Sequence, residues 1–285
     1  MASVTLKQSL PINGNFEPKI DDQMPSSPPP FALIEPLLKC TKIKRINQEV
    51  EYHFYGVVSP RFIASEAANF VSRNSSASKS LLKKIFEEFI VITSNDSQQN
   101  CRVNPKAVWF IVTMTKRSDR YAIPRWHRDG RMVDCTDASH TLHCRYAAAL
   151  VGPRTRVLQE TVLVTQTMRA YIGKRKETSD ALAREVPLNF TPGQIIRFSW
   201  GKEDSPVHSE PDLTKERVFT TVIYGSIDEV KDIVATRREK LTARLVHTGE
   251  ISLSSCCIAL NHRGRNLAKG RMVARAISTN RCLHG

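Results

Sequence analysis

The chain has 285 residues, of which 41% are hydrophobic, and its formal net charge is +14. These values fit a globular protein with a buried core and exclude a chain too polar to fold. The longest apolar runs, residues 107–112 and 147–151, are far too short to span a bilayer. The basic charge favours an acidic partner such as nucleic acid without requiring one.

The cysteines are the next indication of the environment of the protein. Seven of them are scattered at irregular spacing, and the N-terminus has no apolar signal-peptide core. An odd number of unpatterned cysteines is typical of reduced thiols. The sequence therefore predicts an intracellular protein, cytoplasmic or nuclear, and leaves its oligomeric state open.

The first 102 residues predict a leader followed by a supporting segment. Residues 1–30 are rich in turn and polyproline signals and predict a disordered leader. Within residues 31–102, an aromatic run predicts a strand over 51–58, and Ser59 before Pro60 predicts the start of a helix. A second helix is expected over 80–90, where apolar residues recur at helical spacing. This segment is expected to buttress a β domain.

Residues 103–226 have the pattern of that β domain. Runs of β-branched and aromatic residues predict strands over 107–113, 145–151, 155–167, 194–200 and 217–224. The charged segment 173–184 is expected to be a surface loop or a short helix. Short strands between turn signals favour a sandwich or barrel, so the expected fold class is mainly β with flanking helices. Residues 227–285 are expected to be a basic tail, helical over 228–245 or disordered.

One motif in the β domain has the residue types of a metal site. His127 and Asp129 are two residues apart, so on one strand they point to the same side. His208 must come from a neighbouring strand. Two nitrogens and one carboxylate suit Fe(II) and leave coordination positions open, although three such ligands also hold zinc. A histidine that simply bonds to a nearby acid is the common alternative for a His-x-Asp sequence.

The downstream strand carries a cation with a possible chemical use. Arg217 opens the alternating strand 217–224 and follows His208 by nine residues. A guanidinium matches a carboxylate with two parallel hydrogen bonds, so Arg217 is a candidate for binding an organic acid beside the metal. The alternative is a strand-end arginine paired with a surface acid.

These residues together resemble the Fe(II)- and 2-oxoglutarate-dependent dioxygenases, most nearly the prolyl-hydroxylase type. The resemblance covers residues 105–226 and is carried by His127, Asp129, His208 and Arg217. It implies a double-stranded β-helix, or jelly-roll, in which the first three residues are metal ligands. Residues 103–226 would be the oxygenase core.

The resemblance also implies a cofactor set and further contacts. Fe(II) would be the metal, 2-oxoglutarate and O₂ the co-substrates, and succinate and CO₂ the products of hydroxylating or oxidising a substrate. Arg217 would bind the distal carboxylate of 2-oxoglutarate. Tyr146 and Thr221 are further candidates for hydrogen bonds to that acid, and each could equally be a packing residue.

Other interpretations of the sequence stay open. The segment containing Cys135, His140, His143 and Cys144 has zinc-ligand residue types, but adjacent ligands suit one tetrahedral ion poorly, so a loop with chance His and Cys is expected. A non-catalytic jelly-roll binding module with a basic tail that contacts nucleic acid is the alternative function. The substrate stays open among a peptide, a small metabolite and a nucleic acid.

Overall fold

The computed structural model describes residues 30–39, 43, 45–101, 104–129, 144–199, 205–233 and 235, together with the backbone of 277–278. Most of the expected leader and basic tail lies outside the described residues. So do Cys135, His140 and His143, so the zinc-type segment is described only at Cys144. No described helix is long and apolar enough to cross a membrane.

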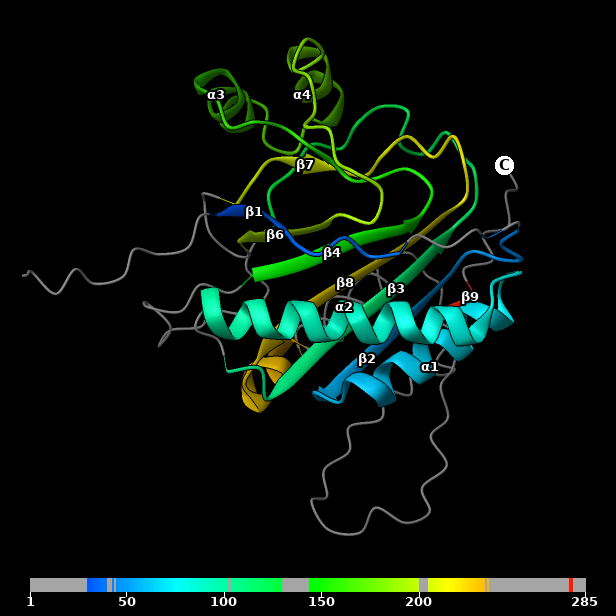
Figure 1. Cartoon of the computed structure of the whole chain (residues 1–285). Helices are drawn as coiled ribbons and strands as arrows, with labels where there is room; N and C mark the ends of the chain where they lie inside the picture. Colours follow the sequence, from blue (N-terminus) through cyan, green and yellow to red (C-terminus); the bar gives the residue numbers. More distant parts are fainter. Residues whose placement is uncertain are drawn as a thin grey trace, which may run out of the picture.

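A seven-stranded antiparallel sheet is the centre of the described structure (Figure 1), with the strand order β1-β6-β4-β8-β3-β2-β9. Its strands are β1 (Phe31–Ile34), β2 (Val50–Val57), β3 (Ala107–Thr115), β4 (Cys144–Val151), β6 (Ile195–Ser199), β8 (Arg217–Gly225) and β9 (Ile277–Ser278). Five of the predicted strands are confirmed as β2, β3, β4, β6 and β8 to within two residues. β1 is an edge strand that the sequence did not predict.

Two helices cover one face of this sheet (Figure 1). α1 (Pro60–Arg73) starts after Ser59 as predicted, although the Ser59 side chain makes no capping hydrogen bond. α2 (Lys79–Asn100) is longer than the predicted 80–90, and its N-cap Ser78 accepts a hydrogen bond from the Leu81 backbone N–H. The main hydrophobic core lies between these helices and the sheet, and includes Ile63, Phe86, Phe89, Phe110, Tyr146 and Tyr224.

The other face of the sheet is partly covered by a small ladder. β5 (Arg156–Val157) pairs with β7 (His208–Ser209), and an isolated bridge joins His127 to His208. Phe198 of the large sheet and Val157 of β5 lie in one buried cluster, so the ladder packs against the sheet. Among the described residues the two sheets do not close into a barrel. The observed fold is mixed α/β on an antiparallel sheet.

One predicted strand is wrong over most of its length. Only residues 156–157 of the expected strand 155–167 are extended, and α3 (Val162–Ala170) takes the rest. Thr161 caps this helix, because its hydroxyl accepts a hydrogen bond from the Val164 N–H at 3.1 Å. α4 (Arg175–Ala181) follows, so the segment 173–184 contains the short helix allowed by the sequence. Figure 1 shows α3 and α4 beyond β7, away from the large sheet.

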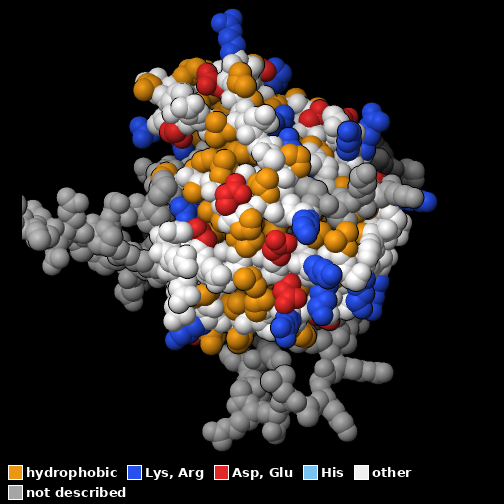
Figure 2. Space-filling model, in the orientation of Figure 1, with side chains coloured by type: hydrophobic (Ala, Val, Ile, Leu, Met, Phe, Trp, Pro, Cys, Tyr) orange, Lys and Arg blue, Asp and Glu red, His pale blue; other side chains and the backbone are white. Residues whose placement is uncertain are grey.

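The described part of the C-terminal region begins as expected. Residues 227–233 are helical, and Val230 and Ile233 pack against Trp109 and Ile223 of the sheet. On the face shown in Figure 2, acidic side chains lie among the basic and hydrophobic ones, so this face does not present a continuous basic surface.

Candidate metal centre

His127 and His208 are brought together by their backbones. The His127 N–H donates to the His208 carbonyl and the His208 N–H donates to the His127 carbonyl, both at 2.9 Å. This is a hydrogen-bonded antiparallel pair, in which opposite side chains leave from the same side. The two imidazole centroids are 4.3 Å apart. Residues 81 positions apart in the sequence therefore meet through main-chain geometry.

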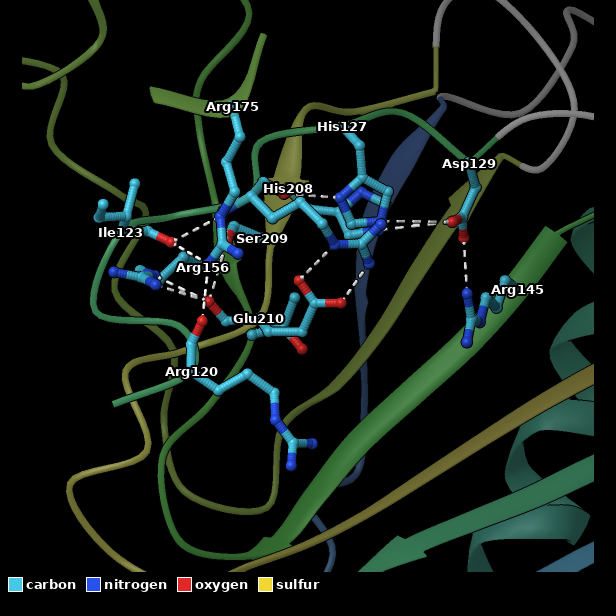
Figure 3. A network of polar contacts seen from close by, with 12 residues as sticks. Arg120, Ile123, His127, Asp129, Arg145, Arg156, Arg175, His208, Ser209 and Glu210 are labelled. Carbon is cyan, nitrogen blue, oxygen red and sulfur yellow. Dashed lines mark hydrogen bonds and ion pairs between the residues drawn. The ribbon is translucent and has the colours of Figure 1, made fainter. Parts of the chain in front are cut away.

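Asp129 completes a three-residue cluster (Figure 3). Its Oδ1 lies 3.6 Å from Nε2 of His208 and 3.9 Å from Nε2 of His127. The three candidate ligand atoms all lie within 4.8 Å of one another. Within the described ranges, no other three His, Cys, Asp or Glu residues are arranged in this way. The triad predicted from the sequence is therefore present.

In each imidazole, the hydrogen bond made by Nδ1 turns Nε2 toward the cluster. Nδ1 of His127 lies 2.8 Å from the Arg125 carbonyl, and Nδ1 of His208 lies 3.0 Å from the Pro206 carbonyl. A carbonyl only accepts, so each Nδ1 donates, and in a neutral ring the lone pair is then on Nε2. Metal-binding histidines are commonly oriented in this way. Burial, together with the neighbouring His208, also lowers the pKa of His127 to about 4, so its ring is neutral near pH 7.

Asp129 is held by a cation from the large sheet. Nη1 of Arg145, in β4, lies 2.9 Å from Oδ2 of Asp129. Burial opposes ionisation of this carboxyl, but Arg145 and His208 outweigh that effect and hold the pKa of Asp129 well below its usual range. Asp129 is therefore a carboxylate at neutral pH, as a metal ligand must be.

Arginines also fasten the loop that leads to His127 (Figure 3). Arg175 donates to the carbonyls of Arg120 and Ile123, and Arg156 donates to the carbonyls of Tyr121 and Glu210. Arg125 forms an ion pair with the Glu210 carboxylate. The contacts of Arg156 and Arg125 tie the loop before His127 to Glu210, which follows His208 by two residues, and Arg175 ties the same loop to α4.

Arg217 is buried at the start of β8 and is not a ligand of the triad. Its Nε donates to the Pro153 carbonyl at 2.9 Å and its Nη2 to the Thr155 hydroxyl at 3.0 Å. Among the described residues it has no carboxylate within ion-pair distance. Burial lowers the pKa of Arg217 to about 9.

The two other candidates for 2-oxoglutarate contacts have different positions. Thr221 lies on the same face of β8 as Arg217, and its hydroxyl is 3.5 Å from Nη2 of Arg145. Tyr146 is not brought to the site. Its ring is in the main core, and its hydroxyl donates to Asp96 of α2 at 2.8 Å. The side chain beside the triad belongs to the preceding residue, Arg145, which sequence reasoning missed.

The geometry of the triad suits a divalent metal ion. The three donors are two imidazole nitrogens and one carboxylate oxygen, a set that fits Fe(II) and that also occurs in catalytic zinc sites. Side-chain exposures of 26% for His127, 10% for Asp129 and 6% for His208 make His127 the most accessible of the three. Such a site could hold a metal and leave room for another ligand.

No protein-family model and no curated protein matches the chain. Solved structures do match. The match to EvdMO1 covers 50% of this chain and 32% of that chain, at 16% identity and a TM-score of 0.29. The match to a rice dioxygenase for auxin oxidation covers 67% and 60%, at 7% identity and 0.33. The match to a Pseudomonas putida prolyl-4-hydroxylase covers 66% and 77%, at 11% identity and 0.28.

These structures include a dioxygenase and a prolyl hydroxylase, the kinds of enzyme that the sequence resembles. Because each of these three TM-scores is below 0.5, only the site itself bears on function. In that site, both imidazoles of a His-x-Asp…His triad are oriented by backbone carbonyls at Nδ1, and Arg145 holds the carboxylate. Its donor set is that of a mononuclear metal centre.

Proposed function

We propose that the protein is an Fe(II)- and 2-oxoglutarate-dependent dioxygenase. The observation that carries the proposal is the convergence of Nε2 of His127, Nε2 of His208 and Oδ1 of Asp129, with both Nδ1 atoms bound to backbone carbonyls. Two nitrogens and one carboxylate on one side of a metal are typical of non-haem iron oxygenases, which need the opposite side for co-substrates. Three fixed protein ligands meet that need.

The residues around the triad have roles in this reaction. His127, Asp129 and His208 hold the metal. Arg217 binds the distal carboxylate of 2-oxoglutarate through its charge, because it is buried without an acidic partner among the described residues. Thr221, on the same strand face, is a hydrogen-bond candidate for the same acid. When bound, iron supplies the O₂ chemistry in which 2-oxoglutarate becomes succinate and CO₂ while one oxygen atom enters the substrate.

The proposal includes a jelly-roll for residues 103–226, with 31–102 as its buttress. The large sheet and the β5–β7 ladder would be its two facing layers, and the His127–His208 pair lies in the ladder. This arrangement supports the assignment because the ligands and Arg217 come from both layers. The substrate stays open among peptide, metabolite and nucleic acid.

Anaerobic titration with Fe(II) and then 2-oxoglutarate tests the proposal. We expect one Fe(II) per chain and a metal-to-ligand charge-transfer band when 2-oxoglutarate is added. His127→Ala and His208→Ala should lose the band, whereas His53→Ala, on β2, should keep it. Absence of the band in wild type, or its persistence in both triad variants, would overturn the assignment.

A second measurement separates an enzyme from a binding module. Succinate release is followed in air with Fe(II), 2-oxoglutarate and panels of peptides, metabolites and oligonucleotides. Turnover that depends on O₂ and stimulation by one panel identify an oxygenase and its substrate class. Tight binding of oligonucleotides with no succinate from any panel favours the non-catalytic module.

A further inference from the structure

Arg145 occupies an unusual place beside the triad. It is the second residue of β4, and its side chain projects onto the face of the sheet that carries the ladder (Figure 3). Nη1 contacts Oδ2 of Asp129 at 2.9 Å, and Nη2 lies 3.5 Å from the Thr221 hydroxyl. The Arg145 side chain is 25% exposed and that of Asp129 is 10% exposed. The ion pair is therefore largely shielded from water.

The two oxygens of Asp129 have different surroundings. Oδ1 is the oxygen that lies 3.6 Å and 3.9 Å from the two imidazole nitrogens. Oδ2 is taken by Arg145 on the other side. A free carboxylate can bind a metal through one oxygen or both, and two bound oxygens would use one more coordination position. The charge-assisted hydrogen bond to Oδ2 competes with metal binding by that oxygen and leaves Oδ1 directed at the imidazoles.

Stability alone does not account for Arg145 in this position. Its Nε is buried and has no hydrogen-bond partner among the described residues. The next residue on the same strand face, Ala147, lies in an apolar cluster with Phe198 and Val157. Burying a guanidinium with an unpaired N–H is unfavourable, and buried ion pairs often stabilise a fold no more than apolar residues do. The feature that Arg145 visibly determines is the orientation of Asp129.

We propose that Arg145 is a positioning residue that keeps Asp129 a one-oxygen ligand of the metal. The inference rests on the proposed function, since it requires that the triad binds a metal. Arg145 touches neither the metal nor the reacting atoms. It fixes the carboxylate in the direction of the two imidazoles and thereby preserves open positions for co-substrates.

Co(II) titration of the purified protein tests this role without catalysis. Co(II) is a spectroscopic substitute for Fe(II), and its visible absorption reports both binding and ligand arrangement. Loss of an outer partner of a metal ligand typically weakens metal binding by roughly 10–100-fold. We expect that loss in Arg145→Gln, together with an altered Co(II) spectrum, and a partial recovery of affinity in Arg145→Lys. Arg61→Gln removes the same charge from a pair with Glu87 between α1 and α2, and should bind Co(II) as wild type does.

Two results would overturn the role of Arg145. One is a folded Arg145→Gln protein with the wild-type Co(II) affinity and spectrum. The other needs no variant, and so holds even if Arg145→Gln does not fold. It is a crystal structure of Co(II)-loaded wild type in which Asp129 binds through both oxygens; one-oxygen binding with Oδ2 on Arg145 supports the inference. If wild type binds no Co(II) or Fe(II), the metal site itself fails, which distinguishes the two proposals.

Discussion

Arg145 and Tyr146 are consecutive residues of β4, and their side chains bind carboxylates on opposite faces of the sheet. Arg145 reaches Asp129 at 2.9 Å on the side of the ladder, and Tyr146 reaches Asp96 of α2 at 2.8 Å on the side of the helices. The sheet therefore separates a polar network at the candidate site from a polar network in the core. Substitutions on the two faces should have separable effects.

The core network predicts that Tyr146→Phe affects stability and not co-substrate binding. The substitution removes the hydroxyl that donates to the buried Asp96 carboxylate. Leaving a buried acceptor without that bond should lower the free energy of unfolding by about 1–3 kcal/mol. Urea denaturation measures this, with Tyr171→Phe, at an exposed ring, as the unaffected control. Weaker 2-oxoglutarate binding by Tyr146→Phe with unchanged stability would show instead that Tyr146 contributes to co-substrate binding.

The same network contains an ion pair whose removal should be costly. Nη1 of Arg197 contacts both Asp96 oxygens, at 3.1 Å and 2.9 Å, and both side chains are under 10% exposed. Arg197→Met alone leaves a buried carboxylate without its cation, so unfolding should become easier by about 3–5 kcal/mol. The double variant Asp96→Leu/Arg197→Met should regain much of this in the same urea measurement. A double variant as unstable as the single one would contradict the explanation.

Arg217 is predicted to act on 2-oxoglutarate and not on the metal. Arg217→Met puts an unbranched apolar side chain in place of the guanidinium and so removes a charge that has no acidic partner among the described residues. Loss of a buried charged partner typically costs about 2–5 kcal/mol, so 2-oxoglutarate affinity should fall strongly. Isothermal titration of the metal-loaded protein measures it, and the Co(II) affinity should not change. Lys215→Met removes an exposed charge two residues away and should bind 2-oxoglutarate normally.

The lowered pKa of His127 predicts that the stability of the metal-free protein depends on pH. Its pKa is lowered from 6.5 to about 4, chiefly because burial disfavours the charged ring. Between these pH values the unfolded chain binds more protons than the folded one, so the stability contributed by His127 is complete above pH 6.5 and is lost as the pH falls to 4. The difference in unfolding free energy between wild type and His127→Asn should therefore shrink over this range. A difference that stays constant would contradict the shift.

The sequence predicts much of this molecule where one local pattern is decisive. Apolar β-branched runs identify β3 and β8, and the Ser59-Pro60 start identifies α1. The triad is predictable because the i, i+2 spacing of His127 and Asp129 already fixes their common side. His208 is singled out from the intervening His140 and His143 by its place between two predicted strands, nine residues before Arg217.

Two failures have a common physical origin, which is that local pattern does not fix tertiary context. Val162 and Thr165 have β-branched side chains, so the sequence predicts a strand where α3 forms. The cap by Thr161, and the burial of Val164 and Thr167 on one side, favour the helix instead. On β4, a shift of one residue exchanges the two faces. Choosing between Arg145 and Tyr146 for the site therefore requires the register of β4 with its neighbours.

The paired main chains of His127 and His208 have a kinetic consequence. Their two amide hydrogens are each bound to the carbonyl of the other residue, so neither can exchange with deuterated water until the segments carrying the imidazoles separate. A metal ion that joins both rings must slow this separation. The rate of hydrogen–deuterium exchange at these two amides thus reports how readily the assembled centre opens, and it can be measured without iron chemistry or a known substrate.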